Sequence, residues 1–127
     1  MKGQKLLVRR ATGADEAGIE EYFREEGLSR PATIEIEFIG KIVGDIVAFA
    51  GASPAGEHTL VLESLHVSVR MRRKRVGRGM MKEIERWAHD MGFRRIIFGI
   101  ESEAQEFFER VGFEQAHGAL VKRVGGE

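Results

Sequence analysis

The sequence contains no cysteine among its 127 residues. The chain therefore has neither a disulfide framework nor a thiolate nucleophile. It also lacks any apolar run that approaches the ~20 residues needed by a membrane-spanning helix. Residues 1–10 are too polar for a signal peptide. We expect a cytoplasmic protein with no membrane association.

An excess of either charge is also missing, because 20 basic residues balance 20 acidic ones. This balance argues against a general nucleic-acid binder, which is usually strongly basic. The four histidines are scattered, and none forms a spacing such as H-x3-H or H-E-x-x-H. We therefore assign no metal site.

The length fits a single domain, and no repeat, linker or low-complexity tract divides the chain. We expect residues 1–127 to form one domain, because a chain of this size can bury a hydrophobic core without cross-links.

Hydrophobic periodicity predicts several strands and three helices. Strands are expected at residues 6–9, 33–43, 46–50, 59–69 and 95–100, with one or two more within 113–124. Helices are expected after a Thr12–Asp15 capping box to about residue 26, at 79–91, and after a second capping box at 102–105. Strand, helix and strand between 59 and 100 predict a parallel pair with a right-handed crossover. These elements indicate a mixed sheet, in an α/β or α+β domain.

The most informative segment is a basic turn with two glycines, between the predicted strand at 59–69 and the helix at 79–91. Six of the nine residues from Arg70 to Arg78 are basic. The first N–H groups of a helix lack intrahelical acceptors and carry partial positive charge. Gly77 and Gly79 lack a Cβ, so an anion can approach the backbone closely. The segment predicts a phosphate site; the alternatives are a solvated turn or a patch for nucleic acid or an acidic partner.

Residues 74–79, Lys-Arg-Val-Gly-Arg-Gly, resemble the coenzyme motif of the GNAT superfamily of N-acyltransferases. That motif has a basic residue, two residues, Gly, one residue, and Gly or Ala. Residues 62–67 are similar to the family's fourth strand, and residues 42–51 suit its second and third strands. Residues 104–113, with the aromatic pair Phe107 and Phe108, are similar to its final-helix signature.

The resemblance implies a single mixed, mostly antiparallel, twisted sheet flanked by helices. It also implies direct transfer of an acetyl group from acetyl-CoA, as co-substrate, to a primary amine. The coenzyme contacts that it implies come from Leu65, His66, Val67, Lys74, Arg75, Val76, Gly77, Arg78, Gly79, Met80 and Phe108.

Acyl transfer to an amine needs a group that accepts the amine proton. Glu63 is the first candidate, because an unpaired carboxylate is unusual on a strand rich in Val and Leu. His66 and Glu101 are the second and third candidates. Members of the family often have Tyr as an acid where this chain has Phe108, and Asn where it has Glu101.

Three functions are compatible with these observations. The first is an acetyl-CoA-dependent N-acetyltransferase. The second is a non-catalytic acyl-CoA-binding domain, suggested by Phe108 in place of Tyr, and the third is a nucleic-acid-associated basic module. The acceptor can be an amino acid, a polyamine, a peptide N-terminus or a protein lysine. A late exposed strand can also pair between subunits and form a homodimer.

Overall fold

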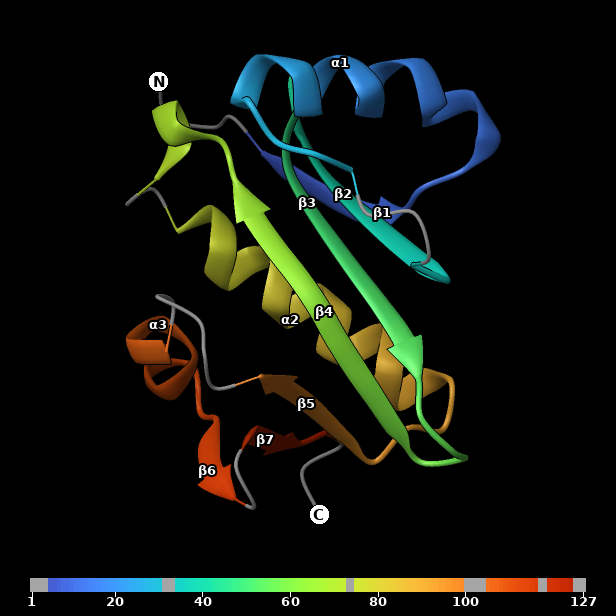
Figure 1. Cartoon of the computed structure of the whole chain (residues 1–127), viewed down its shortest axis with the longest axis vertical. Coiled ribbons are helices and arrows are strands. Elements are labelled where there is room, and N and C mark those ends of the chain that lie inside the picture. Colours follow the sequence, from blue (N-terminus) through green and yellow to red (C-terminus); the bar gives the residue numbers. More distant parts are fainter. Residues whose placement is uncertain (1–4, 31–33, 73–74, 100–104, 117–118, 125–127) are drawn as a thin grey trace.

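The computed structural model describes residues 5–30, 34–72, 75–99, 105–116 and 119–124, which form one sheet flanked by helices (Figure 1). The strands are β1 (Leu6–Arg10), β2 (Ile36–Ile42), β3 (Asp45–Pro54), β4 (Thr59–Val67), β5 (Arg95–Gly99), β6 (Glu114–Ala116) and β7 (Ala119–Arg123). The helices are α1 (Glu16–Glu26), α2 (Val76–Asp90) and α3 (Gln105–Arg110), with 3-10 turns at Gly13–Asp15 and Val69–Met71. None of the helices in these ranges is long and apolar enough to cross a membrane.

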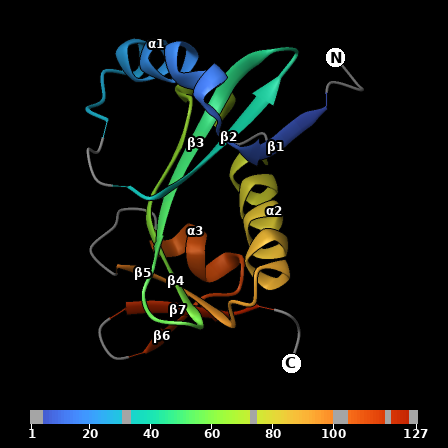
Figure 2. The ribbon, with the colours of Figure 1, turned by 90° about the vertical axis from the view of Figure 1, so that its right-hand side faces the viewer.

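The sheet has the strand order β1-β2-β3-β4-β5-β7-β6. All of these neighbours are antiparallel except β4 and β5, which are parallel and connected through α2. Figure 2 shows α1 on one face of the sheet and α2 with α3 on the other. The predicted mixed, mostly antiparallel sheet with a parallel strand-helix-strand unit is confirmed.

Each face of the sheet has its own core. The larger core lies under α2 and α3, where Met80 and Ile84 of α2 are completely buried against the strands. The smaller core lies under α1, where Ile19, Tyr22 and Phe23 pack on Ile39 and Phe49. Because each face of the sheet packs on a core, β2 and β3 have buried residues on both faces. Buried and exposed residues therefore do not alternate strictly along these strands.

The predicted capping box forms at the 3-10 turn Gly13–Asp15, which leads into α1. The Asp15 carboxylate accepts a hydrogen bond from the Thr12 backbone N–H at 2.8 Å. The Arg9 guanidinium, 2.8 Å away, holds the pKa of Asp15 well below its usual range. The helix ends at Gly27, which takes a left-handed conformation with φ of 69°.

Three predicted details were wrong. Strand β3 continues through Gly51 to Pro54, because these residues keep their pairing with β4. Strand β4 ends at Val67 rather than at residue 69. Helix α2 ends at Asp90 rather than at residue 91, and Met91 is 61% exposed.

Candidate active site

Strand β4 loses one of its two partners halfway along its length. It pairs with β5 only from Thr59 to Leu62, and Leu62 is the partner of Phe98. Its later residues continue to pair with β3 as far as Val67. Beyond Leu62 the described parts of β4 and β5 are no longer paired, which opens one edge of β4.

The backbone of β4 presents hydrogen-bonding groups at this opening. In an antiparallel pair, the N–H and C=O of successive residues point alternately toward and away from the partner strand. Ser68 N–H donates to Val47 O on the β3 side at 2.8 Å. The groups of His66 therefore face β3, whereas those of Leu65 and Val67 face away from it. A ligand with amide groups could pair with this edge.

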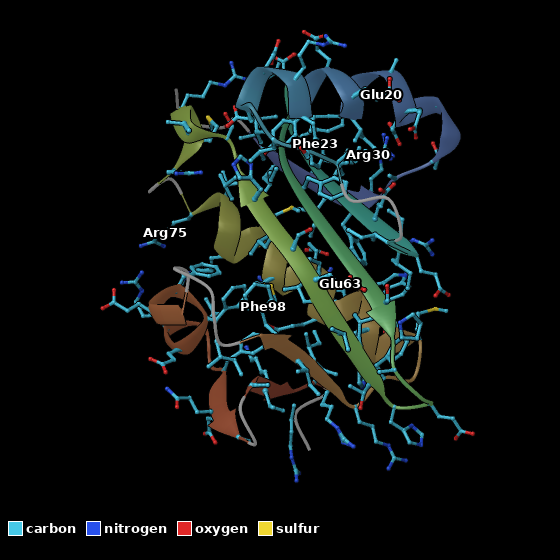
Figure 3. All side chains as sticks on the ribbon, in the orientation of Figure 1. Glu20, Phe23, Arg30, Glu63, Arg75 and Phe98 are labelled. Carbon is cyan, nitrogen blue, oxygen red and sulfur yellow. The ribbon has the colours of Figure 1, made fainter. Side chains whose placement is uncertain are left out.

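A β-bulge lies where the opening begins. Gly51 pairs with Ser64 and Ala52 with Leu62, so Glu63 has no direct partner on β3. Bulges re-aim side chains and are frequent next to active sites. Glu63 is exposed in the middle of β4 (Figure 3). The Ser64 Oγ is buried and has no hydrogen-bond partner among the described residues.

Helix α2 begins at Val76, three residues before the predicted start at Gly79. Arg75 precedes it in a left-handed conformation with φ of 66°, and Figure 3 shows its side chain extending outward. Gly79 N–H already donates to Arg75 O at 3.0 Å. The N–H groups without an intrahelical acceptor are therefore those of residues 75–78.

The two glycines of the motif face different neighbours. A Cβ at Gly79 would lie 2.6 Å from Leu6 Cδ2, so Gly79 allows α2 to approach β1. A Cβ at Gly77 would lie 3.2 Å from Phe107 Cζ and 3.7 Å from Val67 Cγ2. Gly77 thus keeps open the space between the unpaired edge of β4 and α3. The glycine motif at residues 74–79 and the final-helix signature at residues 104–113 are distant along the chain, and they meet at this point.

Phe108 is a core residue in this structure. It is 0% exposed and stacks on Phe98 with ring centroids 4.2 Å apart. Its neighbour Phe107 is only partly buried and contacts it edge to face. Of the aromatic pair, Phe107 is therefore the one with surface available to a ligand.

His66 lies in a polar cluster under α1. Tyr22 Oη is 2.6 Å from its Nδ1, and Arg72 Nη2 is 3.2 Å from its Nε2. Because a guanidinium can only donate, Nε2 must accept and Nδ1 must carry the proton. Tyr22 can then donate to the His66 carbonyl at 3.3 Å. The Arg72 Nε also donates to Val67 O at 3.1 Å, on the open edge of β4.

Burial favours the neutral form of His66. Burial lowers the pKa of His66; Arg72 lowers it further, and Glu26, 3.9 Å from Nε2, opposes the effect. Burial also raises the pKa of Tyr22, so its hydroxyl stays protonated. The Glu26 carboxylate is fixed by a hydrogen bond from Ser68 Oγ at 3.0 Å.

Sequence reasoning missed Tyr22, Glu26 and Arg72 as neighbours of His66. In the sequence, Tyr22 lies on one helical face with Ile19 and Phe23, a pattern that indicates a packed helix and no chemistry. Arg72 was one of six basic residues in the turn, with nothing to distinguish it. Two predicted site residues, Lys74 and Glu101, lie outside the described residues. Within the described ranges, no group of three His, Asp or Glu side chains is arranged to hold a metal ion.

The open, bulged strand β4 is followed by the N-terminus of α2, and comparison with protein families assigns this arrangement to a class. The acetyltransferase (GNAT) family model matches residues 5–113. The chain therefore belongs to the GNAT acetyltransferase family.

Solved structures with the same fold are similar over nearly the whole chain. Ard1 from Thermoplasma volcanium is 15% identical, with a TM-score of 0.76, covering 94% of this chain and 98% of that one. The Escherichia coli GNAT family N-acetyltransferase YhbS, in complex with CoA, is 15% identical with a TM-score of 0.73, covering 98% and 84%. N-acetylglutamate synthase from Neisseria gonorrhoeae, with CoA and N-acetyl-glutamate, is 18% identical with a TM-score of 0.77, covering 98% and 36%. At these identities the likeness shows the fold.

Proposed function

We propose that this protein is an N-acetyltransferase that moves an acetyl group from acetyl-CoA directly to a primary amine. The observation that supports this most is the opening between β4 and β5, which lies beside the free N-terminal amides of α2. Membership of the GNAT family and the CoA bound to two structural neighbours agree with it.

The residues present fit the coenzyme. The amides of Arg75, Val76, Gly77 and Arg78 can bind the diphosphate at the positive end of the α2 dipole. Lys74 would add charge at this loop. The backbone of Leu65 and Val67 can pair with the pantetheine amides along the open edge of β4. The missing Cβ of Gly77 leaves the space between Val67 and Phe107 for that arm.

Glu63 is the proposed base. Acetyl-CoA supplies a thioester whose carbonyl carbon accepts the amine. As the nitrogen–carbon bond forms and the carbon–sulfur bond breaks, Glu63 accepts the amine proton directly or through water. The departing thiolate takes a proton from solvent, because Phe108 has no hydroxyl and is completely buried. Backbone N–H groups of β4 can stabilise the developing negative charge on the carbonyl oxygen.

His66 and Glu101 remain alternative bases. The acceptor lone pair of His66 is directed at Arg72, so His66 can take a proton only after Arg72 has moved away. Glu63 needs no such movement, because its carboxylate is already exposed. This difference places Glu63 first.

Calorimetric titration and thermal melting test the coenzyme assignment. Acetyl-CoA and desulfo-CoA should both raise the melting temperature by mass action, and pantetheine without phosphates should do much less. Equal stabilisation by pantetheine would remove the diphosphate argument. Release of free thiol in the presence of amines then separates an enzyme from a non-catalytic acyl-CoA-binding domain, the alternative that Phe108 favours.

A further inference from the structure

The open face of the sheet carries a pair of opposed arginines. Arg95 of β5 and Arg123 of β7 are register partners, and both side chains are exposed. Ile96, between Arg95 and Ile97, is buried against α2 and α3, so Arg95 and Ile97 lie on the opposite face. Like charges directly opposite each other on one face destabilise a sheet.

Neither arginine has a carboxylate partner among the described residues. Arg95 Nε donates to Thr59 Oγ1 at 3.1 Å, which leaves the rest of its guanidinium available. The chain has as many acidic as basic residues. A shortage of carboxylates therefore does not explain why these two arginines are unpaired. An anionic ligand would remove the repulsion.

A cavity of about 1150 Å³ adjoins the pair. The described residues that line it include Arg94, Arg95, Arg123, His58 and His89 and no Asp or Glu. Its apolar lining includes Ile97, Ala119 and Val121. In the part of the chain that the structure describes, no helix lies over β5 and β7 on this face (Figure 2). Positive charge around an apolar floor fits a ligand with both acidic and apolar groups.

The part of the cavity that Arg95, Ile97 and Val121 line lies on the open face of the sheet, and His89 of α2 lines its other side. Val61 pairs with Ile97 on this face, and Glu63 follows Val61 by two residues, exposed at the bulge of β4. At ~3.3 Å per residue, Arg95 is on the order of 13 Å from Glu63 along the strands. About four residues of extended polypeptide span that length, whereas a free amino acid does not.

We propose that the acceptor amine belongs to a peptide with acidic residues three to four positions from the amine, which bind Arg95 and Arg123. This inference rests on the proposed acetyl transfer and names its acceptor class. The cationic pair orients the peptide across the open sheet face, with the amine at Glu63. Charge complementarity of this kind contributes mainly to specificity.

Two pairs of synthetic peptides test the proposal. One pair carries a free N-terminal amine, and the other an acetylated N-terminus with a single lysine. Within each pair the peptides differ only in having Glu or Gln at the third and fourth positions from the amine. One of the two pairs should be acetylated by acetyl-CoA. In that pair we expect kcat/KM to be at least about ten-fold higher for the Glu peptide than for the Gln peptide, and this ratio should be smaller at high salt.

The double variant Arg95→Gln/Arg123→Gln should bring that ratio close to one. Arg86→Gln, which removes an exposed arginine on α2, is the matched control and should keep the ratio. All side chains changed are exposed, so melting temperatures should confirm folded proteins. Equal kcat/KM for Glu and Gln peptides in the wild type would overturn the proposal while leaving the acetyltransferase function intact.

Fluorescence anisotropy of labelled peptides separates this proposal from the function itself. Tighter binding of a Glu peptide than of its Gln counterpart, lost in the double variant, would support the site even without turnover. Equal binding of both peptides, or tighter binding of a single-stranded oligonucleotide than of the Glu peptide, would overturn it.

Discussion

The two sides of the β4–β5 opening are built in different ways. The proposed coenzyme side uses backbone groups of one continuous stretch, the end of β4 and the start of α2. The proposed acceptor side uses side chains from β4, β5 and β7, which the sheet brings together. A continuous backbone site leaves a local pattern in the sequence, such as the spacing around Gly77. A site of dispersed side chains leaves none, which is why Arg95 and Arg123 gave no signal.

The largest expected effect comes from a substitution on the proposed acceptor side that leaves the proposed coenzyme side unchanged. Glu63→Gln keeps the size and hydrogen bonding of the side chain but removes the proton acceptor. We expect kcat to fall by ~10²-fold or more, the usual scale of general base catalysis, with unchanged affinity for acetyl-CoA. Steady-state kinetics and calorimetric titration measure the two quantities.

Glu20→Gln is the matched control, because Glu20 is exposed on α1, remote from the opening (Figure 3). It should retain wild-type kcat. Full activity in Glu63→Gln would move the base to His66, Glu101 or water.

The sequence predicted most elements because their patterns are local. Three local patterns each lie within a few residues: apolar and acidic residues alternate from Ile34 to Phe38, Met80 and Ile84 have helical spacing, and Thr12 and Asp15 form a cap. The start of α2 was misplaced because Arg75 adopts a left-handed conformation that glycine usually takes. Contacts across the fold, such as Tyr22 with His66, depend on how α1 packs on the sheet and have no local signature.

A second prediction compares alanine substitutions at Gly77 and Gly79 on the proposed coenzyme side. Alanine favours a helix interior over glycine by up to ~1 kcal/mol at either position. Gly77→Ala places a methyl group between Phe107 and Val67, so we expect acetyl-CoA affinity to fall by about five-fold, ~1 kcal/mol. Gly79→Ala meets only the flexible end of Leu6 and should leave that affinity within about two-fold. Calorimetric titration of both variants measures this. The reverse order would mean that the coenzyme does not occupy the space beside Gly77.

The smallest expected effect concerns His66, which lies beneath α1 between the two sides. Burial and Arg72 lower its pKa in the folded state, while the unfolded chain has a pKa near ~6.5. Below that pH the unfolded state binds a proton that the folded state does not, so stability falls as the pH falls through this region. When the pH is lowered from about 7.5 to about 5.5, the melting temperature of the wild type should therefore fall further than that of His66→Gln. The difference between the two decreases should be at most about 4 °C. Histidines elsewhere are present in both proteins, so their contributions cancel in this difference.

Arg72→Gln should reduce the decrease in melting temperature, because it removes the cation that opposes protonation of His66. Parallel curves for the wild type and His66→Gln would show that the ring is solvated, and that the contacts with Tyr22 and Arg72 do not hold it neutral.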